Sequence, residues 1–366
     1  MAFGKTAVLV YMSAIVVLLG GCADKSIIDK IQLAQTLSVD LDGESGGVKN
    51  TVLFSNFERN DQVRIEQLTT RGDNFINALP KMNIHINAPI EYGHLKMMLF
   101  GKSLAEKGLE TVLPSLCRDP EIGSWLLLGV TETEASEALR KVQANNIPYY
   151  LYDMVTQNIK NGNLPEMNFH TFINSYFSPI QDVMLPYLKV EDDGVRLDGI
   201  ALFRENKYVT RIDMRDAFLL KLLLTDSKKG RLLVPMVDEE TNKPYSLLLT
   251  SVHSDTDYKL TATNPLPALS IQVRLNAQIR DYPFSIHLTD SGKRKEVERQ
   301  IEQFLVKQIK RFIAFLQEHR VDPVGFGNIV RSRDRSFQPN EFQDHYPQMK
   351  TDVSVKVNIR LTGLGD

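Results

Sequence analysis

The sequence predicts an α+β protein, a mixture of strands and helices in three successive parts, and three observations carry this prediction. In the first half of the 366 residues, short apolar runs alternate with helix-like segments. In roughly the last hundred residues, two long strands with alternating apolar positions flank one long amphipathic helix. Apolar residues make up 43% of the chain and charged residues 24%, which is typical of folded domains.

The first 21 residues differ in composition from the rest of the chain. Lys5 is followed by an uncharged run from Ala7 to Gly21, which is shorter than the roughly 20 apolar residues that cross a bilayer. A basic start, a short apolar run and small residues at its end are the features of a secretory signal. Because the run ends in Leu-Gly-Gly-Cys, the pattern of a bacterial lipoprotein signal, we predict that residues 1–21 are removed. Cys22 would then carry an S-diacylglycerol and an N-acyl chain; the alternative is an apolar strand with an incidental cysteine.

The chain has one other cysteine, Cys117. If Cys22 is lipidated, no disulfide can form within the chain, so packing alone must hold the exported protein together. We interpret Cys117 as a small residue of the core. A nucleophilic Cys117 is the alternative, although no histidine lies near it in the sequence.

The N-terminal part, residues 22–192, is predicted to begin with a β-hairpin. Residues 37–41 and 51–54 are apolar runs on the two sides of a turn rich in Gly and Asp, and we expect them to pair. The turn contains a G-x-S-x-G sequence at residues 43–47. A strand follows it, so the strand-to-helix context of a hydrolase nucleophile elbow is missing and we reject that interpretation.

A β-α-β-α unit is predicted next. Residues 94–101 and 124–131 are short apolar strands, and residues 102–116 and 134–142 are helix-like segments that follow them. Apolar strands separated by helices indicate a sheet that is covered on both faces. Neither strand-to-helix turn carries a glycine-rich phosphate motif, so no nucleotide site is predicted.

The middle part, residues 195–263, follows an acidic break at residues 190–194. It is predicted to contain a β-hairpin, formed by residues 195–203 and 207–212, and then a helix at residues 214–224 with Asp213 as its N-cap. Two further strands, residues 230–237 and 245–252, complete this part.

The C-terminal part, residues 265–366, gives the clearest pattern. Apolar residues alternate with polar ones from Leu269 to Ile279 and again from Val353 to Leu361, which indicates two half-buried strands. Between them, apolar residues recur every three or four positions from Val297 to Leu316 and form one stripe on a helix. We expect an antiparallel-type sheet packed on this helix. The helix should stop before Pro323, and the glycines that follow should form a tight turn.

Short motifs in all three parts occur in a fixed order along the chain. They include Gly-His after residue 92, Arg-Asp-Pro after Cys117, Gly-x-Ala-x-Phe in the middle part, and Asp-Pro-x-Gly-x-Gly after the long helix. Together with the lipoprotein signal, this order resembles the Ger(x)C family of spore germination lipoproteins. Ala23 departs from the family's tryptophan after the lipidated cysteine. The positions that match family motifs, which we expect to be structural, are Gly93, His94, Arg118, Asp119, Gly199, Asp322, Gly325 and Gly327.

The resemblance implies a role without an established reaction. Members of the family are C subunits of germinant receptors, which act with two integral membrane subunits, A and B, in the inner spore membrane. The resemblance therefore implies a three-domain lipoprotein on the outer face of that membrane, a non-enzymatic subunit that helps to trigger germination. It implies no cofactor.

Composition and spacing argue against several other functions. The formal net charge of −2 gives no general attraction to nucleic acid. The seven histidines are scattered without metal-binding spacing; His85 and His94 could meet across the N-terminal sheet, but no metal site is predicted. The acidic stretches at residues 39–44 and 190–194 do not follow a calcium loop, and we interpret them as solvated turns.

Two alternatives remain open from the sequence. A substrate-binding lipoprotein of a transporter has a similar length and anchor, but it would consist of two similar α/β lobes, whereas the two halves of this chain do not repeat. Residues 293–335 hold eleven basic against six acidic residues. We interpret this excess as the charged outer side of a helix, with contact to anionic lipid or to partner loops as the alternatives.

Overall fold

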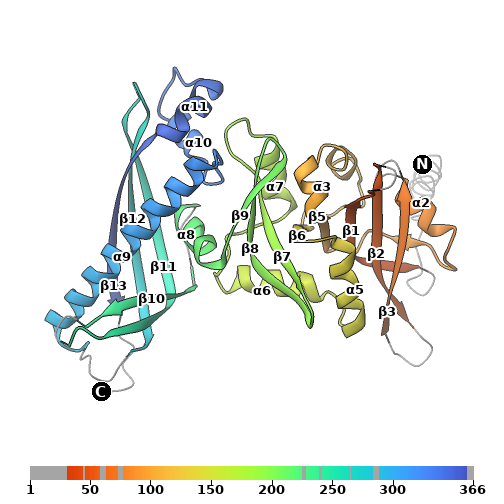
Figure 1. Ribbon diagram of the computed structural model, residues 1–366, viewed down its shortest axis with the longest axis horizontal. Helices are drawn as coiled ribbons and strands as arrows, with labels where there is room; N and C mark the ends of the chain where they lie inside the picture. The colour runs from red at the N-terminus through yellow and green to blue at the C-terminus, as the bar shows by residue number, and fades with distance from the viewer. Residues whose placement is uncertain are drawn as a thin grey trace, which may run out of the picture.

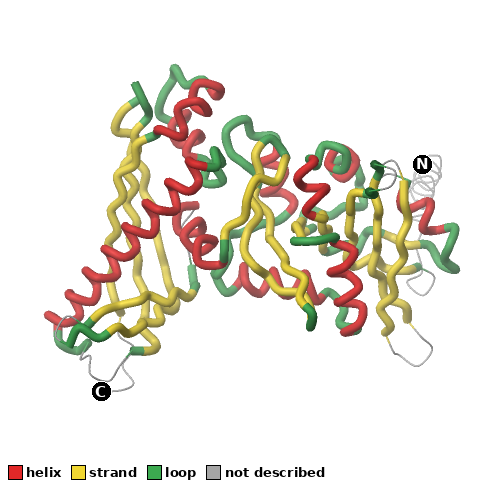
Figure 2. The backbone as a smooth tube through the Cα atoms, in the orientation of Figure 1, coloured by secondary structure: helices red, strands yellow, loops and turns green. Residues whose placement is uncertain are grey.

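The computed structural model describes residues 31–43, 46–57, 63–72, 77–224, 228–238, 241–263, 265–282 and 288–360. The strands of these residues form two sheets with helices packed on them, so the predicted α+β class is confirmed. The first sheet and its helices occupy one end of an elongated molecule, and the second sheet with its long helix occupies the other (Figure 1). Figure 2 shows the same division in the backbone trace.

The first sheet contains nine strands in the order β3-β2-β1-β5-β6-β7-β8-β9, with β4 also paired to β1. Leu37 on β1 lies opposite Val52 on β2, so the predicted N-terminal hairpin is confirmed. β1, β5, β6 and β7 run parallel, as the predicted β-α-β-α unit requires. The strands are β1 (Gln32–Leu41), β2 (Val48–Phe57), β3 (Val63–Gly72), β4 (Ile90–Glu91), β5 (Met97–Gly101), β6 (Leu127–Thr131), β7 (Met184–Glu191), β8 (Gly194–Arg204) and β9 (Lys207–Ile212).

The helices of the first half cover the sheet and are shorter than predicted in one place. The segment at residues 102–116 forms two helices, α3 and α4, because Gly108 adopts a φ of 121° and ends the first one. The helices are α2 (Ala78–Asn83), α3 (Lys102–Lys107), α4 (Leu113–Leu116), α5 (Ala135–Asn145), α6 (Tyr150–Lys160) and α7 (Phe169–Tyr176).

The first sheet continues past the acidic break between the N-terminal and middle parts. β7 pairs with β8 across a tight turn at residues 191–194, and β9 then forms the edge of the same sheet. The helix α8 (Met214–Leu224) follows, and the Asp213 carboxylate accepts a hydrogen bond from the Asp216 amide at 2.8 Å, which confirms the predicted N-cap.

The second sheet has the order β10-β11-β12-β13. β10, β11 and β12 are antiparallel, but β12 and β13 are parallel, so the prediction of an antiparallel-type sheet is wrong for the last pair. The reason is the connection: a long helix carries the chain back to the start of the sheet, which is the geometry of a parallel crossover. The strands are β10 (Arg231–Val237), β11 (Pro244–Ala262), β12 (Ala268–Asp281) and β13 (Lys350–Arg360).

The helix α9 (Ser291–Glu318) crosses the inner face of this sheet (Figure 1). Its predicted apolar stripe is confirmed: Val297, Ile301, Leu305, Ile309 and Leu316 are all buried. They pack against the alternating apolar residues of β12 and β13 in one core, which also includes residues of the first sheet. Three short helices follow: α10 (Phe326–Arg331), α11 (Pro339–His345) and the 3₁₀ helix η2 (Tyr346–Gln348). The predicted final strand position Leu361 lies outside the described residues.

Across the part of the chain that the structure describes, no helix combines the length and the apolar character needed to cross a bilayer.

Candidate functional site

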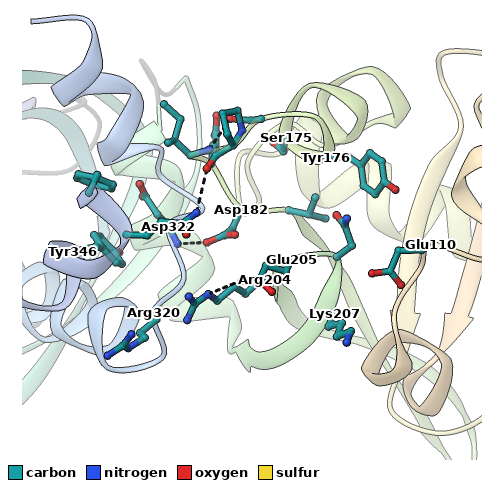
Figure 3. A pocket seen from close by; sticks show the side chains of 18 residues that line it. Glu110, Ser175, Tyr176, Asp182, Arg204, Glu205, Lys207, Arg320, Asp322 and Tyr346 are labelled. Carbon is teal, nitrogen blue, oxygen red and sulfur yellow. Dashed lines mark hydrogen bonds and ion pairs between the residues drawn. The ribbon is translucent and has the colours of Figure 1, made fainter. Parts of the chain in front are cut away.

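A cavity of about 440 Å³ lies where the first sheet meets the turn after α9. Figure 3 shows side chains from the segment before β7, from the β8–β9 turn and from the segment after α9 around it. We call it the joint cavity. The charged residues of its lining are Glu110, Asp182, Arg204, Glu205, Lys207, Arg320 and Asp322.

Asp322 is the most tightly bound side chain of the joint cavity. Its carboxylate accepts hydrogen bonds from the backbone amides of Gly325 at 2.8 Å, Phe326 at 3.0 Å and Gly327 at 2.9 Å. These amides belong to the start of α10, where the first amides of a helix have no carbonyl of an earlier helical turn to bind. Gly325 adopts a φ of 79°, which bends the chain back toward the carboxylate, so the predicted left-handed turn is confirmed.

Asp182 ties this turn to the first sheet. Its carboxylate accepts a hydrogen bond from the Asp322 amide at 2.7 Å, and its own amide donates to the Asp322 carbonyl at 3.0 Å. The neighbouring Gln181 donates to the Pro323 carbonyl at 3.2 Å and accepts from the Asn328 side chain at 3.1 Å. Two segments that are 140 residues apart in sequence are therefore joined by a reciprocal set of hydrogen bonds.

Burial raises the pKa of both carboxyl groups. The pKa of Asp182 rises to about 6, mainly through loss of solvent. The pKa of Asp322 rises to about 7, again through burial first and with repulsion from Asp182 adding to it, although three amide hydrogen bonds oppose the rise. This joint therefore changes its charge close to neutral pH.

The joint connects the segment before β7 to the turn after α9. The carboxylates of Asp182 and Asp322 both accept hydrogen bonds from backbone amides of that turn. Arg204 lies 4.0 Å from Glu205 in a partly exposed ion pair at the rim, which contributes little to stability. Tyr346, which also lines the cavity, donates a hydrogen bond to the Val321 carbonyl at 2.9 Å.

The structure places the other predicted motif positions away from the joint cavity. Gly93 and His94 are exposed in the turn between β4 and β5. Arg118 donates to the Pro114 carbonyl at 2.9 Å, and the Asp119 carboxylate accepts from the Glu121 amide at 3.0 Å. Burial raises the pKa of the neighbouring Tyr92, and the negative charge of Asp119 adds to this rise.

Gly199 lies inside β8 with a φ of 139°. A Cβ atom at this position would lie 1.8 Å from the Ile212 carbonyl oxygen of the neighbouring strand. Since the register between β7 and β8 shifts at Tyr187 and Leu188, this position combines a β-bulge with close backbone contact.

The structure tests the prediction made for one of the two cysteines and not that made for the other. Cys22 lies outside the described residues. The prediction that Cys117 is a core residue is wrong, because its side chain is exposed at the end of α4. Partial desolvation of the sulfur raises the pKa of the thiol, which disfavours the thiolate that a nucleophile needs.

The two histidines that could have met across the N-terminal sheet, and the acidic residue Asp40, can also be compared with their predictions. His85 and His94 are exposed, and no group of three potential metal ligands occurs within the described residues. Asp40 lies in a stretch interpreted as a solvated turn, and this was wrong: its carboxylate is buried and accepts hydrogen bonds from the Ala135 and Ser136 amides at the start of α5. Sequence could not show this contact, which spans 95 residues.

Comparisons with known proteins place the whole chain in one group. A family model described as the spore germination protein N-terminal domain matches residues 24–190, and one described as spore germination B3/GerAC-like, C-terminal, matches residues 198–363. The chain is 26% identical to the spore germination protein GerQC of Bacillus cereus, over 95% of this chain and 96% of that protein. It is 21% identical to the spore germination protein KC of Bacillus subtilis (strain 168), over 98% and 95%. The crystal structure of the GerBC protein has the same fold, with a TM-score of 0.58 and 18% identity over 88% of this chain and 96% of that one.

Proposed function

The chain belongs to the Ger(x)C family of spore germination proteins, and from that premise we propose that it is the lipoprotein C subunit of a germinant receptor. The observation that carries the proposal is the match of both family models, in order and over almost the full length. In this proposal the chain is a non-enzymatic component that assembles with two integral membrane subunits, A and B, in the inner spore membrane.

The proposed anchor is Cys22, at the end of the signal-like segment 1–21. Each acyl chain gains about 0.8 kcal/mol per buried CH₂, so a diacylglycerol would hold the protein firmly where a single chain would exchange. A tethered C subunit would keep both of its sheets beside the membrane subunits. Docking to partners is supported by the charged lining of the joint cavity.

Membrane fractionation of a Cys22→Ala variant tests the anchor. We expect this variant to leave the membrane fraction and to slow germination, because one cysteine carries both acyl attachments. The matched control is Cys117→Ala, which removes the other cysteine of the chain at an exposed position and should change neither property. A Cys22→Ala protein that stays in the membrane fraction would contradict lipidation at this residue.

Co-purification tests the receptor assignment separately from the anchor. Affinity purification of the intact protein from detergent-solubilised spore membranes should recover a multi-spanning protein and a larger membrane protein with soluble domains. A deletion strain should respond poorly to particular germinants while forming normal numbers of spores. Recovery of transporter subunits, with normal germination in the deletion strain, would instead support a substrate-binding lipoprotein.

A further inference from the structure

Trp125 is the one tryptophan of the chain, and 71% of its side chain is exposed. It lies just before β6, beside a second cavity of about 360 Å³ bounded by α6, the α6–α7 loop and α8. We call this the Trp125 cavity. Its apolar wall includes Leu127, Tyr152 and Met167. An exposed indole that lines a cavity beside apolar side chains can pack against a bound molecule.

The charged residues of the Trp125 cavity have an excess of positive charge. Lys160 comes from α6, Lys221 from α8, and Lys228 from the segment after α8. Glu166, from the α6–α7 loop, is the one acidic residue among the lining side chains that the structure describes. The lining therefore favours an anionic ligand over a neutral or cationic one.

Lys221 is a buried cation without an acidic partner among the described residues. Its side chain is 8% exposed, and its ammonium group donates hydrogen bonds to the Gly162 carbonyl at 2.7 Å and the Lys229 carbonyl at 3.1 Å. Burial alone lowers its pKa to about 8, so it still carries its charge at neutral pH. The two carbonyls satisfy two of the three N–H groups but do not neutralise the charge.

The backbone near Lys221 is shaped to admit this ammonium group. Gly162 adopts a φ of 77°, and a Cβ atom there would lie 2.7 Å from the Lys221 Nζ. A purely structural lysine that links two loops would explain these hydrogen bonds. It would not explain why the same cation lines a cavity that an exposed indole also lines.

We propose that the Trp125 cavity binds a small organic anion with an apolar body. In this site the apolar body packs against Trp125, Leu127 and Tyr152. The carboxylate accepts a hydrogen bond from the remaining N–H of Lys221, and Lys160 and Lys228 add to the attraction at the rim. This site is separate from the joint cavity and does not depend on the receptor assignment.

The single tryptophan makes the site directly testable with the full-length protein. Trp125 fluorescence is recorded during separate titrations with decanoate, decanol and decylammonium. These three monomeric amphiphiles have the same alkyl chain and differ in charge. Decanoate should shift the emission to shorter wavelength in a saturable manner, since it covers an exposed indole. Its dissociation constant should be at least about tenfold lower than that of decanol, and decylammonium should give no saturable shift.

Variants separate the contributions of charge and of the indole. Lys221→Met should abolish the preference for decanoate over decanol. If Lys221→Met does not fold, a double variant with Lys160→Ala and Lys228→Ala is used instead. It should raise the dissociation constant of decanoate by about threefold or more, because two positive charges at the surface are lost. Lys310→Ala, an exposed lysine on α9, is the matched control and should bind decanoate as the parent does. Trp125→Phe, followed by calorimetry, should bind decanoate more weakly.

Several outcomes would overturn the proposal. The first is the absence of a saturable shift with decanoate up to 1 mM, a concentration roughly a thousandfold above the dissociation constant of a micromolar ligand. The second is an equal affinity for decanoate and decanol. The third is unchanged binding of decanoate by the lysine variants. A shift with phosphatidylglycerol vesicles but not with monomeric decanoate would also overturn it, because this face would then be a membrane contact.

Discussion

Gly199 shows how one residue can fix the geometry of a sheet. Its positive φ and the Ile212 carbonyl beside it leave no room for a side chain. The strand on which it lies also brings Ile200 into one core cluster and Ala201 into the other, so a shift of this backbone would disturb buried packing on both sides of the sheet.

A Gly199→Ala substitution should therefore destabilise the protein by roughly 2–4 kcal/mol, since it combines backbone strain with a steric clash. Urea unfolding measures the change. Gly93→Ala is the matched control, because Gly93 lies in an exposed turn where a Cβ would meet nothing within 4 Å. Equal stability of the two variants would contradict the role assigned to Gly199.

Asp322 makes the stability of the joint depend on pH. Its pKa is raised to about 7 in the folded protein, from an ordinary value of 3.8. The folded state therefore binds more protons than the unfolded state between these values, so stability should fall as pH rises from about 4 to about 7. The expected loss is on the order of a few kcal/mol.

An Asp322→Asn variant should show a flatter pH dependence across that range, because the amide does not titrate. Thermal unfolding at several pH values measures this, with Asp182 expected to leave a smaller residual slope near pH 6. Asp352→Asn, at an exposed position on β13, serves as the control. If both variants keep the parent's slope, the joint is not the source of the dependence.

At the scale of elements, α9 protects the exposed edge of the second sheet. Among the described strands, β13 pairs with β12 alone, so the amides on its other edge need other acceptors. The Val357 amide donates to Glu302 at 3.0 Å and the Ile359 amide donates to Glu298 at 2.8 Å. Two glutamates one helical turn apart thus replace a missing strand.

Substituting both Glu298 and Glu302 by Ala should expose this edge. Hydrogen exchange at the Val357 and Ile359 amides should become at least about tenfold faster, and the protein should self-associate more readily at high concentration. Glu318→Ala, an exposed position at the end of the same helix, is the matched control. Unchanged exchange at both amides would contradict a protective role of the two glutamates.

Whether the sequence predicts an element depends on how far apart in the chain the interacting residues lie. The stripe on α9 and the alternation in β12 are local patterns, and both are as predicted. The parallel pairing of β12 with β13 depends on a helical crossover between distant segments, and the periodicity of either strand does not encode it. The break at Gly108 could have been suspected from the glycine itself.

The candidate site was predictable only in part for the same reason. Asp322, Gly325 and Gly327 were visible as a motif, and their local turn was expected from the glycines. Asp182, which completes the joint, lies in a segment without any distinctive pattern and meets Asp322 only in the folded chain. Buried polar contacts of this kind depend on tertiary geometry rather than on neighbouring residues.

At the scale of the whole molecule, the first sheet does not end where the sequence composition changes. β8 and β9 follow the acidic break near residue 192, yet they complete the sheet that begins with β1. Ile200, Leu202 and Phe203 on β8 are fully buried. The division into residues 22–192, 195–263 and 265–366 remains a prediction about domains, and the sheet itself crosses its first boundary.

A fragment of residues 24–213 should consequently fold better than a fragment of residues 24–192. The longer fragment contains every strand of the first sheet, whereas the shorter one exposes the edge of β7 and lacks the buried side chains of β8. Circular dichroism melting should give a cooperative transition for the longer fragment only. A cooperative transition in the shorter fragment would support the boundary at residue 192.

The parallel pairing of β12 with β13 also sets an order of events during synthesis. Asn276 pairs with Asn358, so 82 residues must be made before the second sheet can close. Until then β12 has an open edge, and α9 has no complete sheet to cover. The second sheet is therefore exposed to aggregation and proteolysis until β13 is available, and its assembly depends on residues far downstream of β12.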